Sequence, residues 1–91
     1  MVVIVKLYAN FRMAAGVDKV EINGAGDVFE LLKALAAKFG KGLAKELFEG
    51  KRPRSSVNLM VNGRGADLKS ELHKKLTDGD TVMIFPPVSG G

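Results

Sequence analysis

Residues 27–40, DVFELLKALAAKFG, form the stretch that decides how this chain folds. Asp27 is a good residue to cap the start of a helix, and Glu30 follows three positions later, as a capping box requires. Five apolar residues recur at the spacing of one helical face: Val28, Leu31, Leu32, Leu35 and Phe39. Gly40 ends the pattern, because glycine takes the left-handed conformation of a helix end at little cost. The stretch predicts one amphipathic helix that packs against something else.

Apolar, β-branched runs on both sides of this helix supply the surface that it packs on. We expect strands at residues 2–8, 17–23, 57–61 and 81–85. Between them, residues 9–16 form a loop or short helical turn, Leu43–Phe48 a short second helix, residues 51–56 a basic loop, and residues near Ser70–Leu76 a helical turn. Asn62-Gly63 and Asp78-Gly79-Asp80 predict turns. The order β-β-α-β-(β)-β predicts an α+β fold, a mixed sheet with one main helix on one face.

The alternation of side chains along a strand predicts which residues face that helix. The inward residues are Val3, Val5, Leu7, Leu59, Val61, Val82 and Ile84, and the outward apolar residues are Val2, Ile4, Met60, Met83 and Phe85. A monomer rarely exposes such an apolar patch without a use, so we expect it to dock a partner protein. The alternatives are a loop that covers the patch, or a register shifted by one residue, which would exchange the two faces.

Length and composition bound the classes of protein that this chain can be. Its 91 residues predict one domain. It contains no cysteine, which excludes disulfides, thiolate metal sites and a cysteine nucleophile. No apolar run is long enough for a membrane span, and the N-terminal residues do not have the pattern of a signal peptide. We therefore expect a cytoplasmic protein with no membrane partner.

No group of residues predicts a catalytic or metal site. His73 is the single histidine and lies among charged residues, so a solvated position is expected; a metal site usually needs three or four ligands. Asp27 and Glu30 cap a helix, while Asp78 and Asp80 shape a turn. We therefore expect a protein without enzymatic activity and without a bound cofactor.

The chain has a formal net charge of +4 and contains one basic stretch. It contains Lys38, Lys41, Lys45, Lys51, Arg52 and Arg54. A solvated face is the default interpretation, and a rim that steers an acidic partner is the sharper one. Binding of RNA is the third interpretation, because no aromatic residues are interleaved with the basic ones for stacking on bases. We expect no nucleic-acid partner.

The last residues, Phe85-Pro86-Pro87-Val88-Ser89-Gly90-Gly91, predict an extended tail after the domain of residues 1–85. Pro86-Pro87 favours polyproline II, in which residues 86–91 reach about 18 Å, at roughly 3.1 Å per residue. Gly90 and Gly91 have no Cβ and can pass a narrow channel in a partner enzyme. The alternatives are a terminus without function or a truncation point.

This tail resembles the terminus of the small subunit of molybdopterin synthase (MoaD) and its relatives. Asp78-Gly79-Asp80, Val61-Asn62-Gly63 and the segment Leu7–Arg12 followed by Ala15-Gly16 also resemble that family, so the similarity covers nearly the whole chain. Related branches include the thiamine sulfur carrier ThiS and the small archaeal ubiquitin-like modifiers. The resemblance implies a β-grasp, ubiquitin-like fold. Gly40–Arg54 is longer and more basic than in the bacterial subunit, as in the longer archaeal members.

The resemblance also implies a mechanism centred on the carboxylate of Gly91. A ubiquitin-activating-type enzyme would use ATP to adenylate it, and a sulfur donor would convert it to a thiocarboxylate. Pro86, Pro87, Val88, Ser89 and Gly90 would enter the large subunit of molybdopterin synthase, which receives the sulfur. In the modifier branch, lysines of target proteins attack the activated end instead. A third hypothesis is a non-covalent ubiquitin-like binding module with an inert tail.

Overall fold

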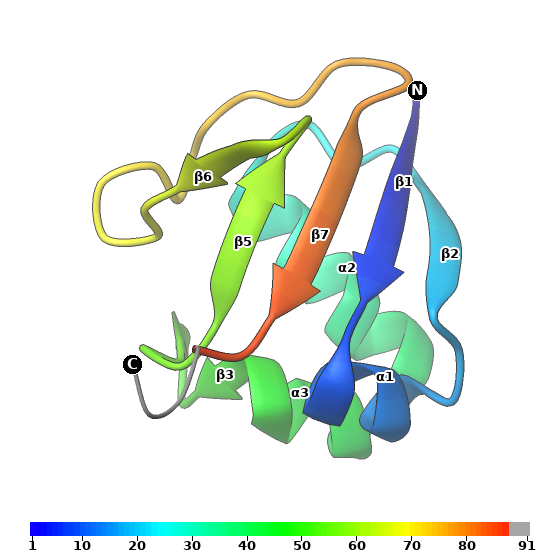
Figure 1. Ribbon diagram of the computed structural model, residues 1–91, viewed down its shortest axis with the longest axis vertical. Coiled ribbons are helices and arrows are strands. Elements are labelled where there is room, and N and C mark those ends of the chain that lie inside the picture. Colours follow the sequence, from blue (N-terminus) through cyan, green and yellow to red (C-terminus); the bar gives the residue numbers. More distant parts are fainter. Residues whose placement is uncertain (88–91) are drawn as a thin grey trace.

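The amphipathic helix predicted from residues 27–40 lies across one face of a five-stranded sheet (Figure 1). The computed structural model describes residues 1–87. In chain order the elements are β1 (Val2–Leu7), α1 (Ala9–Ala15), β2 (Lys19–Asn23), α2 (Val28–Phe39), α3 (Lys41–Leu47), β3 (Phe48–Glu49), β4 (Arg52–Pro53), β5 (Asn58–Val61), β6 (Arg64–Ala66) and β7 (Thr81–Phe85). The predicted α+β, β-grasp architecture is confirmed.

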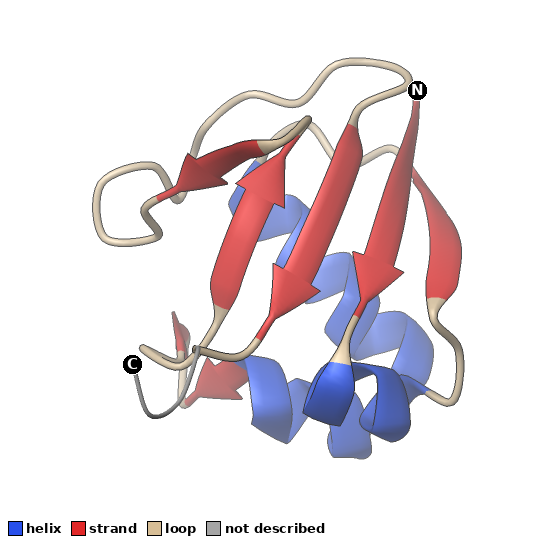
Figure 2. Cartoon of the chain, in the orientation of Figure 1, coloured by secondary structure: helices blue, strands red, loops and turns tan. Residues whose placement is uncertain are grey.

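The strand order is β2-β1-β7-β5-β6, so β7, the last strand in sequence, lies in the centre of the sheet. It pairs in parallel with β1 and antiparallel with β5, while the pairs β1–β2 and β5–β6 are antiparallel. The sheet is therefore mixed, as expected. The helices lie on one face only, and the other face carries no element of residues 1–87 (Figure 2).

The core lies between the sheet and the helices, and the strand alternation places it there. Its inward residues are those predicted: Val3, Val5, Leu7, Leu59, Val61, Val82 and Ile84 are all buried. From α2, Val28, Leu31, Leu32 and Leu35 are fully buried. Phe39, the fifth residue of the predicted helical face, is only partly buried because it lies in the last turn. The predicted register is confirmed, and the exchanged-face alternative is wrong.

Several predicted boundaries are corrected. The first strand ends at Leu7, because Tyr8 is the N-cap of α1, and β2 begins at Lys19 instead of residue 17. The second helix begins at Lys41, directly after Gly40. Gly40 does end α2, with φ +82° and ψ −165°, which is not the predicted left-handed helical conformation but another region favoured by glycine. The same residue is the N-cap of α3, so the two helices meet there.

The sequence pattern missed the β3–β4 hairpin and indicated β6 only as an optional strand without bounds. The predicted basic loop at residues 51–56 contains β4, which pairs with β3 in a small hairpin after α3. The third predicted strand begins at Asn58, and its β6 partner follows the Asn62-Gly63 turn. Asn62 and Gly63 both have positive φ, +52° and +83°, as a type I′ hairpin turn requires. These strands have only two or three residues, too few for an alternation to be read.

The helical turn predicted near Ser70–Leu76 is wrong. This segment contains turns and one isolated bridge, between Lys75 and Asp27. Its carbonyls accept from the start of α2: Val28 N–H donates to Lys74 at 3.1 Å and Phe29 N–H to Leu72 at 2.9 Å. The segment forms turns instead of a helix, and two of its carbonyls bond to the open end of α2.

Candidate docking surface and C-terminal end

The central strand β7 fixes the point from which the chain leaves the sheet. Ladder partners flank it on both sides, and Val82 and Ile84 are fully buried. Near its end, the Ile84 carbonyl accepts from Tyr8 N–H at 3.1 Å. Phe85 pairs with Asn58 and is half-buried, Pro86 is half-buried, and Pro87 is exposed. Because β7 is held on both sides, the chain leaves the sheet after Phe85 at a fixed point at one end (Figure 1).

The remaining predicted tail residues, Val88, Ser89, Gly90 and Gly91, lie outside the described residues. The boundary between a domain of residues 1–85 and a tail of residues 86–91 stays a prediction. So does the assignment of Gly91 as the activated residue.

The five predicted docking residues lie together on the face of the sheet away from the helices. Met60 of β5 pairs directly with Met83 of β7. Ile4 of β1 pairs with Thr81 of β7, one outward position before Met83. Each of Val2, Ile4, Met60, Met83 and Phe85 is partly exposed, and no helix, strand or loop of residues 1–87 crosses this face of the sheet (Figure 2). The covering-loop alternative is therefore wrong for the described part of the chain. We call these five residues the outer apolar face.

The strands at either side of the outer apolar face give it two different borders. On β2, Glu21 lies opposite Ile4 and Lys19 opposite Lys6, so this border is charged. On β6, Gly65 lies opposite Met60 and has no side chain. A Cβ added at Gly65 would meet nothing within 4 Å. The β6 border is therefore open, and another protein can approach Met60 from that direction. The sequence indicates an optional strand between residues 61 and 81 without its bounds, so it did not place Gly65 at this border.

A groove adjoins the outer apolar face at the root of the tail. It is lined by Phe85, Met60, Gly65, Leu68, Arg52 and Arg54, among others. The groove is thus lined by β4 and the residues after it, by β5 and β6, and by the loop that follows β6. Arg54 is held in place there, since its Nε donates to the Lys45 carbonyl at 2.6 Å. The sequence treated the basic residues and the tail as separate features, and the fold places Arg52 and Arg54 beside Phe85, the residue before the tail.

At the opposite end of the sheet, the predicted turn carboxylates are structural. The Oδ1 of Asp78 accepts from Val2 N–H at 2.7 Å. The carboxylate of Asp80 accepts from Thr77 N–H at 2.8 Å and from the side-chain amide of Asn62 at 2.8 Å. These hydrogen bonds lower the pKa of Asp80 below its ordinary value of 3.8. Asp78 and Asp80 therefore tie the chain start and two turns together.

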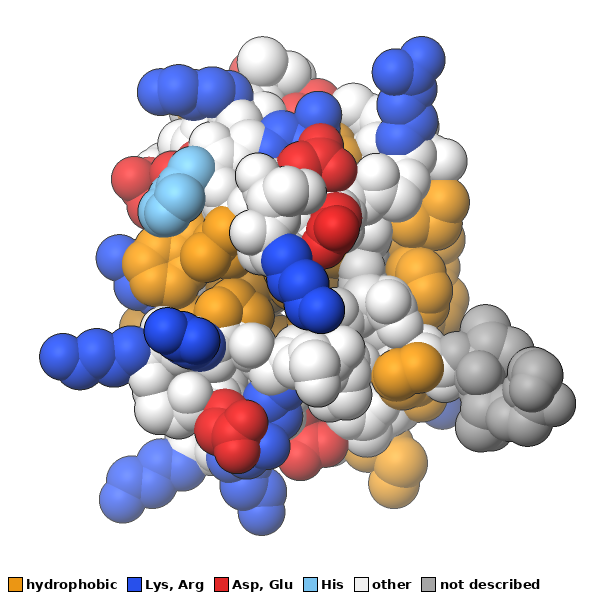
Figure 3. Space-filling view, turned by 90° about the vertical axis from the view of Figure 1, so that its left-hand side faces the viewer, with side chains coloured by type: hydrophobic (Ala, Val, Ile, Leu, Met, Phe, Trp, Pro, Cys, Tyr) orange, Lys and Arg blue, Asp and Glu red, His pale blue; other side chains and the backbone are white. Residues whose placement is uncertain are grey.

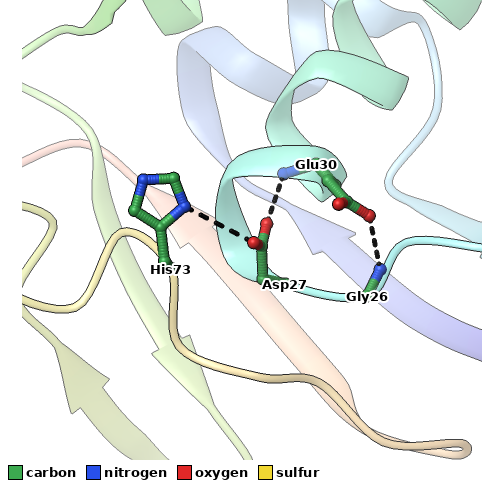
Figure 4. Close-up of polar contacts among 4 residues, drawn as sticks. All are labelled: Gly26, Asp27, Glu30 and His73. Carbon is green, nitrogen blue, oxygen red and sulfur yellow. Dashed lines mark hydrogen bonds and ion pairs between the residues drawn. The ribbon is translucent and has the colours of Figure 1, made fainter.

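The remaining titratable pair, Asp27 and His73, lies at the start of α2 (Figure 4). One Asp27 oxygen accepts from Glu30 N–H at 2.8 Å, and the other lies 3.4 Å from His73 Nδ1. Burial opposes the ionised form of Asp27, but these hydrogen bonds lower its pKa below 3.8. The His73 side chain is 70% exposed. Within residues 1–87, no three His, Cys, Asp or Glu side chains gather in a way that could hold a metal ion.

This arrangement belongs to a ubiquitin-like protein: a β-grasp body with an apolar sheet face and a C-terminal segment leaving the central strand. The model of the ThiS family matches residues 5–91, nearly the whole chain. The chain belongs to the ThiS family. None of the helices in the described residues is long and apolar enough to span a membrane.

Three similar proteins place the chain more narrowly within this group. Small archaeal modifier protein 3 of Haloferax volcanii is 33% identical over 88 residues, which are 94% of this chain and 95% of that protein. The crystal structure of SAMP1 from Haloferax volcanii superposes with a TM-score of 0.84 and 30% identity over 100% of both chains. A putative molybdopterin converting factor, subunit 1, from Pyrococcus furiosus gives a TM-score of 0.74 and 36% identity, over 97% of this chain and 99% of that one.

Proposed function

We propose that this protein is a sulfur carrier that works through the carboxylate of Gly91. The single observation that carries the proposal is a ThiS-family body whose central strand leads directly into a Pro-Pro-Val-Ser-Gly-Gly sequence. A body of this kind keeps the outer apolar face free for a partner while the last residues extend into the partner's active site.

The chemistry follows from the low reactivity of a carboxylate. In the first step an oxygen of the Gly91 carboxylate attacks the α-phosphorus of ATP, and pyrophosphate leaves. A ubiquitin-activating-type enzyme would bind the ATP, so this chain needs no cofactor of its own. In the second step the sulfur of a donor attacks the acyl carbon, and AMP leaves as the C–S bond forms. With a persulfide as the donor, a thiol then reduces the acyl disulfide by two electrons: it breaks the S–S bond, forms a disulfide itself, releases the donor as a thiol and leaves a thiocarboxylate on Gly91.

We further propose that the thiocarboxylate donates its sulfur in the biosynthesis of molybdopterin, inside the large subunit of molybdopterin synthase. The similarity to a putative molybdopterin converting factor subunit of Pyrococcus furiosus supports this pathway. The outer apolar face would contact each partner in turn, because both must receive the same tail.

Intact-mass measurement tests the sulfur-carrier proposal. The chain is incubated with a cognate activating enzyme, ATP and a sulfur donor. We expect a mass increase that corresponds to the exchange of one oxygen for one sulfur. Deletion of Gly90-Gly91 is the control and should abolish the increase. An unchanged mass in the full chain would count against sulfur transfer, and unchanged cellular function after the deletion would favour an inert tail.

The second candidate function is a protein modifier, joined through Gly91 to lysines of target proteins. The observation that favours it is the 33% identity to small archaeal modifier protein 3 of Haloferax volcanii. Both functions use the same adenylation step and differ in the nucleophile that follows. Proteolysis and mass spectrometry of cellular proteins would reveal lysines that carry the chain's C-terminal remnant. If no such lysine is found, the chain is not a modifier.

A further inference from the structure

The positive charge of this protein is concentrated in one segment. Residues 28–54 contain seven of the 14 basic residues and three of the ten acidic ones. The rest of the chain then holds seven of each and is formally neutral. The whole net charge of +4 therefore comes from α2, α3 and the β3–β4 hairpin, on the helix side of the molecule.

These cations have no anionic partners within the described part of the chain. The ion pairs found within 4.0 Å in residues 1–87 are His73–Asp27 and Lys74–Glu71, neither of which involves residues 33–54. Two of the three acidic groups in the segment are engaged elsewhere. Glu30 accepts from Gly26 N–H at 2.9 Å, and Glu46 accepts from the Asn10 side chain at 2.8 Å. The positive charge in this segment is therefore available to another molecule.

The fold places part of this basic segment next to the root of the tail. Lys41 and Lys45 lie four residues apart on α3, on one helical face. The hydrogen bond from Arg54 to the Lys45 carbonyl holds the β3–β4 hairpin against this helix, and Arg54 N–H also donates to the Leu47 carbonyl at 2.8 Å. Arg52 and Arg54 in turn line the groove that contains Phe85. Figure 3 shows Lys and Arg side chains projecting on the side away from the apolar sheet face and at the lower end.

We propose that this basic surface, formed by Lys38, Lys41, Lys45, Lys51, Arg52 and Arg54, binds an acidic polypeptide segment of the partner that receives the tail. Opposite charge on a partner raises the rate of encounter and fixes orientation, which matters for a chain that must insert its end into an active site. The identity of the partner rests on the proposed function. The preference for an acidic polypeptide rests on the surface alone.

RNA fits this surface less well. Single-stranded nucleic acid binds through aromatic rings on which the bases stack, in addition to positive charge. The aromatic residues of the segment, Phe29, Phe39 and Phe48, are all half-buried. Phe29 also packs edge-on against Phe48 and lies under the Lys33 amino group, 4.7 Å from its ring centre. No ring of this segment is left free for a base.

A titration followed by NMR tests the surface directly. The full chain is titrated with a short peptide of alternating Glu and Gly, with the matching Gln and Gly peptide, and with a uridine oligonucleotide. We expect the acidic peptide alone to shift the amide signals of α3 and residues 48–54. The double variant Lys41→Glu/Lys45→Glu should bind this peptide about tenfold more weakly, because it reverses two charges at the centre of the surface.

The matched control is Arg64→Glu/Lys75→Glu. It makes the same change in net charge on two exposed residues that border one hollow at the other end of the molecule. This control should keep most of the affinity. The proposal is overturned if both double variants lose affinity equally, if the acidic peptide does not bind, or if the oligonucleotide binds the same amides as tightly as the acidic peptide.

A kinetic experiment connects the surface to the partner. ATP–pyrophosphate exchange by the activating enzyme measures adenylation, and Lys41→Glu/Lys45→Glu should lower kcat/KM about tenfold while leaving kcat unchanged. Raising the salt from about 50 to about 300 mM should remove the difference from wild type. No exchange with the wild-type chain would refute the proposed function, while the peptide result would stand. If the exchange had the same kcat/KM with Lys41→Glu/Lys45→Glu and with the control Arg64→Glu/Lys75→Glu, this role of the surface would be refuted.

Discussion

The carboxylate of Asp80 shows how much a single residue can connect in this small domain. Its two oxygens accept from Thr77 N–H, the Thr77 hydroxyl at 3.0 Å and the Asn62 amide. Asn62 in turn accepts from Thr81 N–H at 2.9 Å. The turn before β7 and the turn between β5 and β6 are thus joined through one side chain. This network positions the start of the strand that ends at the tail.

The first prediction concerns the stability that this network provides. Asp80→Ala removes the acceptor of three hydrogen bonds and should lower the free energy of unfolding by about 1–3 kcal/mol. Asp78→Ala removes one acceptor, for Val2 N–H, and should have a smaller effect. Urea unfolding followed by circular dichroism measures both variants. An equal loss in the two would mean that Asp80 is no more important than an ordinary turn residue.

The second prediction follows from the lowered pKa of Asp80, caused by the Thr77 N–H and the Asn62 amide. Because the folded-state pKa lies below the unfolded one, the ionised carboxylate stabilises the fold above the ordinary pKa of 3.8. This contribution is lost as the pH falls through the folded-state value. The unfolding free energy of the wild type should therefore fall more steeply below about pH 4 than that of Asp80→Asn. Urea unfolding at a series of pH values measures this. If the unfolding free energies of the wild type and of Asp80→Asn fell with the same slope at acid pH, the assignment would be contradicted.

At the scale of elements, the start of α2 receives partners from two distant parts of the sequence. Asp27 accepts from Glu30 N–H, as the capping-box pattern predicts. The Glu30 carboxylate reaches back one residue further than the pattern requires, to Gly26 N–H instead of Asp27 N–H. The carbonyls of Leu72 and Lys74 bind the next two free N–H groups. The bonds to the N–H groups of Val28, Phe29 and Glu30 satisfy donors that a helix start would otherwise leave open.

The third prediction is that Asp27→Ala lowers the free energy of unfolding by about 1 kcal/mol, whereas Asp27→Ser retains most of it. Serine keeps an oxygen within reach of Glu30 N–H. Asp18→Ala, an exposed aspartate outside any helix, is the control and should change little. Thermal and urea unfolding measure all three variants. If the serine variant were as unstable as the alanine variant, the loss would come from the contact with His73 and not from the cap.

At the scale of the whole molecule, two surfaces with different chemistry meet at the end of β7. The outer apolar face lies on one side of the sheet, and the basic surface lies on the helix side beyond the groove at Phe85. The apolar face can be buried against a partner and stabilise a complex, while the basic surface acts at longer range. We expect variants of the first to change the dissociation rate, and variants of the second to change the association rate.

The fourth prediction uses Gly65 to block the outer apolar face without damage to the core. Its backbone lies outside the left-handed region, and an added Cβ would meet nothing within 4 Å. Gly65→Lys should therefore keep the wild-type unfolding curve, yet it places a charged side chain beside Met60. We expect binding to the activating enzyme to weaken by about tenfold, through faster dissociation.

Two controls separate docking from folding in that experiment. Gly65→Ala adds only a methyl group and should bind close to wild type. Met13→Lys places the same charge on α1, at a methionine that is 79% exposed and lies away from the sheet face. Surface plasmon resonance measures the dissociation rates. If Gly65→Lys and Met13→Lys have the same effect, the outer apolar face is not the docking surface.

Local chemistry determined a large part of this protein. The capping pair at Asp27, the spacing of Val28, Leu31 and Leu35, and the strand alternation specified the main helix and both faces of the sheet, because these periods depend on the chain alone. The Gly-Gly end and the mid-chain turns suggested the ThiS family, which the family match over residues 5–91 confirmed.

Only the tertiary structure decided which distant segments of the chain lie next to each other. The sequence predicts a helical turn near residues 70–76, yet the segment forms other turns, and its Leu72 and Lys74 carbonyls accept from the open N–H groups of α2. The optional strand of the predicted order is β6, and its three residues, with Gly65 at the open border of the sheet, are located only by their pairing with β5. The meeting of the basic hairpin with Phe85 depends on contacts between segments about thirty residues apart, which no local pattern encodes.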